Sequence, residues 1–474
     1  MDHLVSAISE HYAVRSTYST PTEALKGRTG PKDRPLMALN DQTFTSLEWD
    51  AIPQRRSHLQ LVLTTVVEPP GGGTNKVLVY SGDAEQPAAA FDLICSDPYE
   101  IHAIPLPAAC IPDSGPLVLR LKVENPGLLW FFAPDSSASG GLEFHVPHLV
   151  DTSSGKGDYL ARLVSMASIQ TFSWKEGCVL DAIHTLSERG MCPAGSAMIR
   201  KHLNYFGFEP GNLVYETPRS SRVSNELDTI ETTLPFAHVA LLDLNHPWVD
   251  LAVSFWSQLI AAHGQAREPH MISSEGAYTV AYPMTLIARL RGEPKWFGVA
   301  ESLLVETFQS LVRPDGVYLR DFNGEKQTHR NWARGLCWLL LGHVQTLRQQ
   351  PEPSAKILEQ LEYLAAFAKG HQSEAGLWHC FVDEPEVLPD TSGSAGIAAA
   401  FALAAREGYL PQEYFQRAQL THEALQTYLT PDGFLSGCSQ SNKGGEELQR
   451  SPHRVTLPYA LGLLGLLDAA TAGS

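Results

Sequence analysis

Two different periods of hydrophobic and polar positions divide the chain. After a polar, loop-like stretch (residues 1–35), short runs between about residues 57 and 147 alternate apolar with polar positions, and Pro, Gly and Asp clusters separate them. Such runs are typical of an antiparallel β-sandwich, because successive side chains of a strand point to opposite faces. The predicted strands are residues 59–67, 77–80, 117–123, 129–132 and 142–146.

Beyond about residue 158 the period becomes helical. Apolar residues recur at i, i+3, i+4 and i+7, which indicates amphipathic helices. One segment, residues 396–405, is apolar on all sides, which predicts a helix that is buried all round. The predicted helices include residues 296–311, 332–347, 355–369, 394–407, 413–429 and 456–470.

A glycine-containing turn returns three times between these helices. Gly316, Gly376 and Gly433 are 60 and 57 residues apart, a period that fits one pair of helices with its loops. About 310 residues at this period make roughly five to six hairpins, and six hairpins close into an (α/α)6 barrel. We therefore predict a mainly helical fold with a β-sandwich domain in residues 1–150, a linker at 151–157, and an (α/α)6 barrel in residues 158–474.

Composition narrows the range of functions. The 474 residues are 43% hydrophobic and 18% charged, and the formal net charge of −17 disfavours binding to nucleic acid. No run of 18 apolar residues is present and the first residues show no secretory signal, so we expect no membrane span and a cytoplasmic location. The seven scattered cysteines are expected to be free thiols. No metal-ligand spacing, dinucleotide motif or G-x-S-x-G is present, so no metal or cofactor is expected.

Four ordered segments resemble one family of enzymes. The segment from Asn331 to Trp338 resembles the W-x-R-G-x-x-W signature of the six-hairpin unsaturated uronyl hydrolases, glycoside hydrolase families 88 and 105. The segment from Asp390 to Gly396 resembles their E-T-S-G-T-A segment. Residues 225–230 and 274–278 stand where those enzymes carry their two aspartates. The resemblance covers about residues 160–470 and implies a hydrolase that removes a terminal uronic acid.

Two positions depart from that family's pattern. Glu275 stands where the family has its catalytic aspartate, and Arg320 stands where it has a histidine. Both changes touch the chemistry of vinyl-ether hydration. They favour a related uronidase, similar to the glucuronidases of family 154, and they leave a non-hydrolytic homologue open.

The two carboxyls that the resemblance implies are Glu275 as general acid and Asp228 as its partner. They are 47 residues apart, which is close to one hairpin, so adjacent inner helices would bring both to one face. A pair of carboxyls in different environments is the usual means of acid/base cleavage of a glycosidic bond. The alternatives are a helix N-cap for Asp228 and a first-turn residue for Glu275.

Other side chains are candidates for substrate binding. Arg334 could pair with a uronate carboxylate, or equally with an internal acid, because an unpaired charge in an apolar helix is costly. Trp332 and Trp338 could stack on sugar faces or belong to the core. Loops expected to face the same site add Arg320, His270, His329 and Trp174, and Tyr278 follows Glu275 by three residues on the same helical face.

Three functions therefore remain. The first is a glycoside hydrolase for a terminal uronic acid, saturated or Δ4,5-unsaturated, with a small anionic saccharide as its substrate. The second is a non-hydrolytic cyclase or isomerase that uses the same cavity. The third is a sugar-binding protein in which the sandwich recognises the ligand. Oligomeric state is left open.

Overall fold

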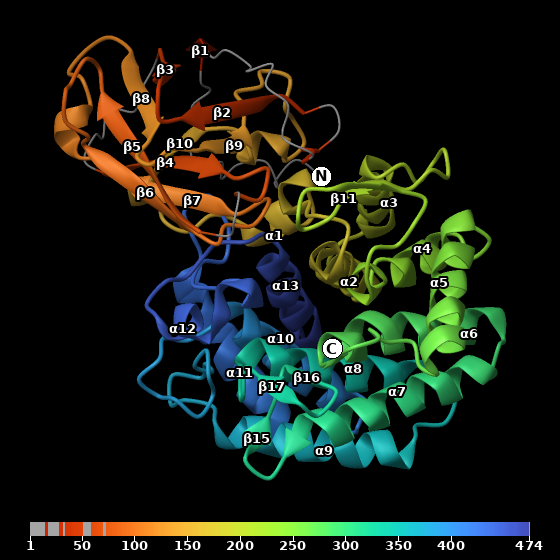
Figure 1. The fold of residues 1–474 in the computed structure, drawn as a ribbon. Helices are drawn as coiled ribbons and strands as arrows, with labels where there is room; N and C mark the ends of the chain where they lie inside the picture. Colours follow the sequence, from red (N-terminus) through yellow and green to blue (C-terminus); the bar gives the residue numbers. More distant parts are fainter. Residues whose placement is uncertain (1–14, 18–27, 32–33, 51–57, 70–72, 474) are drawn as a thin grey trace.

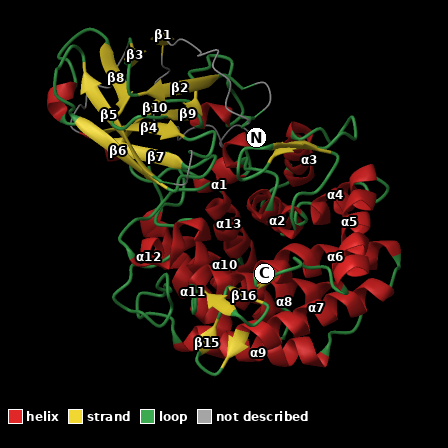
Figure 2. Cartoon of the chain, viewed as in Figure 1, coloured by secondary structure: helices red, strands yellow, loops and turns green. Residues whose placement is uncertain are grey.

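A sheet domain sits beside the mouth of a ring of helices (Figure 1). The computed structural model describes residues 15–17, 28–31, 34–50, 58–69 and 73–473. Among the described residues, strands predominate up to Asp151 and helices predominate from Tyr159 onward (Figure 2). The predicted fold class, mainly helical with an N-terminal antiparallel β-sandwich, is confirmed. The predicted division at residues 150 and 158 stays a prediction.

The sheet domain consists of two antiparallel layers. One sheet has the order β1-β3-β8-β5-β6, and a second has the order β10-β4-β7 with the β2-β9 pair beside it through a bridge between Thr65 and Phe131. The strands are β1 (Arg15–Thr17), β2 (Leu36–Asn40), β3 (Thr45–Trp49), β4 (Leu59–Thr64), β5 (Thr74–Ser81), β6 (Ala89–Ile94), β7 (Ile101–Pro105), β8 (Leu117–Val123), β9 (Leu128–Phe132) and β10 (His148–Asp151).

The two sheets differ in how many faces they bury. In β8, Leu117, Leu119, Leu121 and Val123 are buried and the intervening residues are not, as expected for a sheet with one solvated face. In β9 the run from Leu129 to Phe132 is buried without alternation. Leu129 and Phe131 join the core of the sandwich, whereas Trp130 and Phe132 join the core of the helical ring. The second sheet therefore packs against the helices with its outer face.

In the part of the chain that the structure describes, six inner helices surround the centre of the ring. They begin at Trp174, Phe236, Tyr282, Ala333, Thr391 and Tyr459, and each contacts the next, with the last returning to the first. Their bounds are α2 (Trp174–Glu188), α4 (Phe236–Leu242), α6 (Tyr282–Arg291), α8 (Ala333–Gln349), α10 (Thr391–Arg406) and α13 (Tyr459–Thr471). Helices α8, α10 and α13 are buried almost throughout, as the apolar pattern of residues 396–405 predicts.

Outer helices pack against this inner ring. The longer ones are α3 (Gly195–Tyr205), α5 (Pro247–His263), α7 (Lys295–Leu311), α9 (Ala355–Gly370) and α11 (Gln412–Leu425), and the short ones are α1 (Tyr159–Leu163) and α12 (Gly445–Arg450). Short antiparallel pairs fill the connections: β11 (Val214–Glu216) with β12 (Arg222–Ser224), β13 (Ile272–Ser273) with β16 (Arg320–Phe322) and β17 (Lys326–Thr328), and β14 (Val312–Arg313) with β15 (Gly316–Val317).

The recurring turns lie where the sequence places them, between an outer and an inner helix. Gly316, Gly376 and Gly433 all have positive φ, which explains why glycine recurs at this point of the hairpin. One predicted strand is wrong: residues Leu142–Phe144 form a 3-10 helix and the strand β10 follows it. The strands β2 and β3, before residue 57, have no counterpart among the predicted ones.

Candidate active site

Glu275 lies just before the inner helix α6 (Tyr282–Arg291). It follows β13 and precedes a short π-helix, Ala277–Ala281, which leads directly into α6. The side chain is 6% exposed. Its Oε2 accepts a hydrogen bond from Ser273 Oγ at 2.5 Å, and its Oε1 accepts one from Asn442 Nδ2 at 3.3 Å. A π-helical turn at this point is notable because such turns are frequent at functional sites.

Arg320 joins two carboxylates. It lies in β16, which pairs with β13, so the sheet register puts Arg320 directly opposite Ser273. Its Nε and Nη2 donate to both oxygens of Glu275 at 3.2, 2.8 and 3.1 Å, and the same Nη2 donates to Glu231 Oε1 at 3.3 Å. Since both acids contact the same nitrogen, a carboxylate oxygen of Glu231 lies within about 6 Å of one of Glu275. Among the described residues no partner is recorded for Nη1.

Glu231 is the second acid of the site. It lies in a 3-10 turn, Ile230–Thr232, just before α4. Burial raises the pKa of its carboxyl, the nearby charge of Glu275 raises it further, and Arg320 opposes both effects. Glu275 is held by three donors and Glu231 by one long contact, so the two carboxyls differ in environment as acid/base pairs do.

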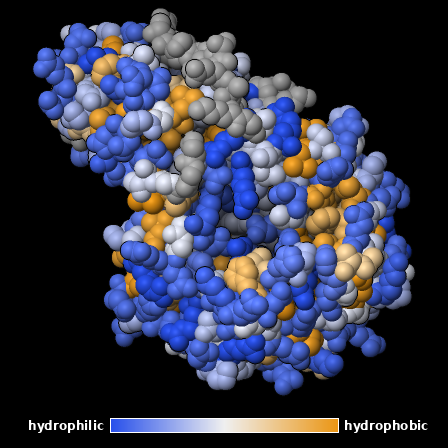
Figure 3. Space-filling view, viewed as in Figure 1, coloured by the Kyte–Doolittle hydropathy of each residue, from blue (hydrophilic) through white to orange (hydrophobic). Residues whose placement is uncertain are grey.

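Glu231 and Arg320 form part of the wall of a cavity of about 330 Å³. The wall has a charged part and an apolar part, and it is made of Thr229, Ile230, Glu231, Glu268, Pro269, His270, Met271, Ser273, Arg320 and Phe322. His270 is exposed and Phe322 is 37% exposed, so both belong to the rim. The surface is hollowed where the helical ring meets the sheet domain, with mainly hydrophilic residues around the hollow (Figure 3).

Asp228 does not lie with Glu275. Its side chain is exposed and is absent from the wall of the cavity, and its backbone N–H donates to the Tyr215 hydroxyl at 3.0 Å. Its carboxylate does not cap the following 3-10 turn either, which begins after Thr229. The acid that lies near Glu275 is Glu231, three residues after Asp228. Its carboxylate contacts the guanidinium of Arg320, which also contacts Glu275.

Arg334 has its partners inside the protein. The side chain is 2% exposed, and it donates to the carbonyl oxygens of Ser439 at 2.9 Å and Gln440 at 2.6 Å and to the Tyr459 hydroxyl. The charge of Asp390 lies near enough to help hold Arg334 protonated. Arg334 is therefore satisfied inside the protein, by carbonyl oxygens and a hydroxyl rather than by the direct ion pair with an internal acid that was one of the two alternatives.

The aromatic candidates belong to the packing at the centre of the ring. Trp332 and Trp338 are 2% and 3% exposed, and the guanidinium of Arg334 lies 4.4 Å from the ring centre of Trp332. Trp174 is half-buried and its ring lies 5.0 Å from that of Trp338. Tyr278 is fully buried, and its hydroxyl donates to Asp181 at 2.5 Å. None of these four side chains lines the 330 Å³ cavity.

His329 differs from the other candidate binding residues in its backbone conformation and in its ring nitrogens. It is 8% exposed, its φ of 52° is left-handed, and neither ring nitrogen has a hydrogen-bond partner among the described residues. Its backbone N–H donates to Glu446 Oε1 at 2.7 Å. Burial lowers the pKa of its imidazole, while the charge of Glu446 opposes this effect. Buried polar atoms are nearly always paired and left-handed backbone is costly, so a ligand contact would account for both features.

Sequence reasoning missed Glu231, Ser273 and Asn442. Glu231 stands 44 residues before Glu275, which fits one hairpin as well as the 47 residues of Asp228 do, so spacing alone could not choose between them. Asn442 comes from the far end of the chain and carries no local motif. Within the described residues, no group of three or more His, Cys, Asp or Glu side chains is placed to hold a metal ion, and the thiols of Cys110, Cys178, Cys192, Cys337, Cys380 and Cys438 are free.

Comparison with known proteins bears out the resemblance read from the sequence. The model of Glycosyl Hydrolase Family 88 matches residues 262–470. The curated unsaturated rhamnogalacturonyl hydrolase YesR of Bacillus subtilis is 27% identical over 157 residues, which is 31% of this chain and 44% of that relative. The match therefore spans less than half of the relative's length.

Solved structures share the fold of the helical part. A possible member of glycoside hydrolase family 105 from Salmonella enterica superposes with a TM-score of 0.54 at 19% identity, covering 64% of this chain and 84% of that one. A family 105 glycoside hydrolase from C. acetobutylicum gives a TM-score of 0.54 at 18% identity, over 64% of this chain and 94% of that one. The six-hairpin architecture of the ring is thereby confirmed. In the described part of the chain, none of the helices has the length and apolar content that crossing a membrane requires.

Proposed function

We propose that the protein is a glycoside hydrolase that removes a terminal uronic acid, saturated or Δ4,5-unsaturated, with Glu231 and Glu275 as its acid pair. The observation that carries the proposal is Arg320, which contacts both carboxylates at the wall of a cavity of about 330 Å³. The match to family 88 over residues 262–470 supports the reaction class. A cytoplasmic location and a small anionic saccharide as substrate are part of the same proposal.

The two acids take different roles. Glu275 accepts hydrogen bonds from Arg320, Ser273 and Asn442, which fix the position of its carboxyl group. Its role is to orient water and to stabilise positive charge on the sugar ring. Glu231 has a raised pKa and only one long contact, so it is the proton donor. The proton goes to the glycosidic oxygen of a saturated uronide as its bond to the sugar carbon breaks, or to the double bond of an unsaturated one. Water then adds to the electron-deficient sugar carbon, and the proton that it releases returns to Glu231.

Arg320 also offers a binding site for the uronate carboxylate. Its Nε and Nη2 are used by the two acids, while Nη1 has no recorded partner among the described residues. A guanidinium has five N–H donors, so one group can hold the catalytic acids and a ligand carboxylate at once. His270 at the rim adds a second donor.

The test is a panel of saturated and unsaturated uronides with the wild-type protein and three variants. Loss of ultraviolet absorbance reports hydration of the double bond, and release of the aglycone reports cleavage of a saturated uronide. We expect Glu231→Gln and Glu275→Gln to lower kcat by roughly 10²–10⁴-fold, the usual contribution of acid/base catalysis. Glu209→Gln, an exposed carboxylate paired with Arg200, is the matched control.

Asp228→Asn separates the two assignments of the second acid. We expect it to retain activity near the level of the control, since Asp228 does not contact Glu275. Full activity in both Glu231→Gln and Glu275→Gln would end the proposal, as would an inactive wild-type protein on every uronide of the panel.

One feature of the cavity favours a second candidate, a non-hydrolytic cyclase or isomerase. Ile230, Pro269, Met271 and Phe322 give part of its wall an apolar character. This candidate predicts binding of an apolar ligand, measured by calorimetry, together with no turnover of any uronide. If the protein instead hydrolyses uronides and prefers an apolar aglycone, these apolar residues bind the leaving group.

A further inference from the structure

One short stretch of chain lies between the sheet domain and the acid site. We call residues 439–446 the mouth segment; it begins after Cys438, which forms a β-bridge with Val455, and runs through a 3-10 turn, Asn442–Gly444, into α12. Its two central residues point to different partners. Asn442 donates to Glu275 Oε1 at 3.3 Å, and the next residue, Lys443, pairs with Glu68 Oε1 at 2.9 Å and with Asp97.

Residues of the helical ring hold the N-terminal end of the mouth segment. Arg334 donates to the carbonyl oxygens of Ser439 and Gln440, and Asp390 accepts hydrogen bonds from the backbone and hydroxyl of Ser439 at 3.0 and 2.8 Å. These partners are all buried, so this end is fixed by the helical core itself.

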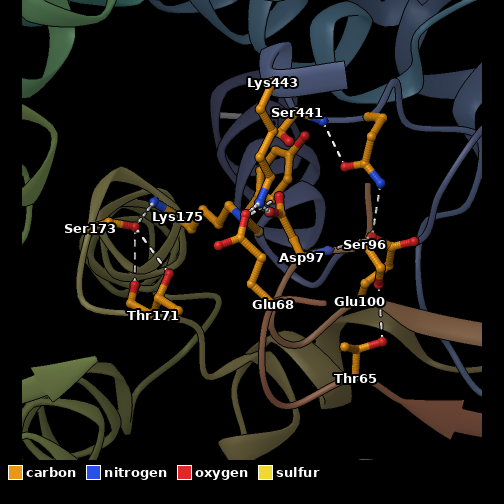
Figure 4. Close-up of polar contacts among 12 residues, drawn as sticks. Thr65, Glu68, Ser96, Asp97, Glu100, Thr171, Ser173, Lys175, Ser441 and Lys443 are labelled. Atoms are coloured by element: carbon orange, nitrogen blue, oxygen red, sulfur yellow. Dashed lines mark hydrogen bonds and ion pairs between the residues drawn. The ribbon is translucent and has the colours of Figure 1, made fainter. Parts of the chain in front are cut away.

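The sheet domain holds the segment from the other side. Gln440 Nε2 donates to Glu100 Oε2 at 2.9 Å and to the carbonyl oxygen of Ile94 at 3.2 Å. Lys443 reaches Asp97, which also accepts a hydrogen bond from Lys175 at 2.8 Å, the second residue of the inner helix α2. Figure 4 shows Lys175 and Lys443 approaching Asp97 from different sides, with Glu68 beside them.

Asp97 is the centre of this arrangement. It is 1% exposed, and the pKa of its carboxyl is lowered: burial alone would raise it, but the charges of Lys175 and Lys443 outweigh that effect. A buried carboxylate between two ammonium groups is stable only while all three remain, because removing one leaves an unpaired charge. The sheet domain thus contributes a carboxylate that joins α2 to the mouth segment.

From these contacts we propose that the sheet domain is a positioning unit of the active site: Asp97 and Glu100 hold the mouth segment so that Asn442 contacts Glu275. This inference rests on the proposed function for the role of Glu275. Asp97, Glu100 and Lys443 are positioning residues that act through Asn442, and none of them touches the substrate.

The kinetic test compares Asp97→Asn with Asp92→Asn, an exposed carboxylate of β6 in the same domain that pairs with Lys76. We expect Asp97→Asn and Asn442→Ala to lower kcat by about 10-fold while KM changes by less than about 3-fold, in line with the loss of one hydrogen bond to a charged group. Lys443→Gln, at a half-exposed site, gives the same comparison if Asp97→Asn does not fold. Lys443→Arg keeps the charge and should restore most of the activity.

A folding check separates positioning from loss of stability. The side chains that contact Glu275 are Arg320, Ser273 and Asn442. Positioning predicts that kcat falls in Asn442→Ala and in Asp97→Asn alike, at a temperature where circular dichroism shows both variants folded. Unchanged kcat in both variants, with an active wild type, would overturn the inference.

Hydrogen–deuterium exchange tests the same inference without a substrate. We expect uptake in residues 439–446 and 272–276 to rise at least several-fold in Asp97→Asn and to stay at the wild-type level in Asp92→Asn. If the wild-type protein hydrolyses no uronide, the proposed function fails, and the exchange still decides whether the sheet domain holds the segment at Glu275. Equal uptake in the two variants would mean that it does not.

Discussion

At the scale of single residues, the site depends on one guanidinium with several partners. Arg320 binds both oxygens of Glu275 and one oxygen of Glu231, so its positive charge offsets the repulsion between the two carboxyl groups. The sequence led to Glu275 and Arg320 but not to Glu231. The stretch from Asn225 to Thr233 has no period, because it is irregular chain and a 3-10 turn, and without a period no face can be assigned to its acids.

Replacing Arg320 tests this account. We expect Arg320→Gln to lower kcat/KM by at least about 100-fold, since charge-assisted hydrogen bonds are worth about 1.5–3 kcal/mol each and several are lost. Arg320→Lys should recover only part of this loss, because an ammonium cannot contact two carboxylates with the geometry of a guanidinium. Arg313→Gln is the matched control, as Arg313 lies on the same connection and pairs only at 3.7 Å with Asp321. Activity in Arg320→Gln equal to that control would exclude a role for Arg320 in the site.

At the scale of elements, the helical period predicted the bounds of the helices well, whereas the structure of the short connections was not predicted. The predicted helices at 296–311 and 355–369 agree with α7 and α9 to within a residue, because a long amphipathic pattern determines the face and extent of a helix. The predicted strand at 142–146 failed because three apolar residues in five fit a 3-10 turn as well as a strand. The site lies on such connections, which is why its partners were harder to predict than its scaffold.

Close packing of the inner helices depends on glycines that no period reveals. A Cβ at Gly462 of α13 would lie 2.5 Å from the carbonyl oxygen of Cys178 in α2, which is closer than real Cβ atoms come. At Gly298, exposed in α7, a Cβ would meet nothing within 4 Å. Both glycines are inside helices with ordinary φ, so the two positions differ mainly in the space around them.

This difference predicts opposite effects of one substitution. Gly462→Ala should lower the free energy of unfolding by about 1–3 kcal/mol, because α13 and α2 must move apart. Gly298→Ala should raise it by about 0.5–1 kcal/mol, the helix-propensity difference between the two residues. Urea unfolding followed by circular dichroism measures both. A stabilised Gly462→Ala variant would show that the contact between α13 and α2 is looser than the structure has it.

At the scale of the whole molecule, the sheet domain and the ring are joined by a shared core and a polar junction. Trp130, Phe132 and Val150 of the second sheet belong to the same apolar cluster as Tyr159 and Met166 of the helical part. The polar junction lies beside it, at Asp97, Glu100 and the mouth segment. The sequence predicted both domains from their periods, but it could not predict the junction, since each of its members is a single polar residue far from the others in the chain.

Glu100 makes this junction sensitive to pH. Burial raises the pKa of its carboxyl to about 7, against an ordinary value of 4.5. The folded protein therefore holds a proton at Glu100 between about pH 4.5 and 7 that the unfolded chain releases, so the stability it contributes falls as pH rises through this window. Because a tenfold change in an acid dissociation constant corresponds to about 1.4 kcal/mol, the stability lost by pH 8 amounts to about 3 kcal/mol.

The Glu100→Gln variant isolates this effect, because glutamine keeps an acceptor for Gln440 and cannot ionise. The free energy of unfolding is measured by urea denaturation from pH 5 to pH 8. The value for Glu100→Gln minus that for the wild-type protein should increase by about 1–3 kcal/mol over this range. Glu124→Gln, at an exposed site just after β8, should leave the difference from wild type constant. A constant difference for Glu100→Gln as well would mean that Glu100 is already ionised in the folded protein. The junction would then contain an additional buried negative charge beside Asp97, and Glu100 would accept the hydrogen bond from Gln440 as an ionised carboxylate.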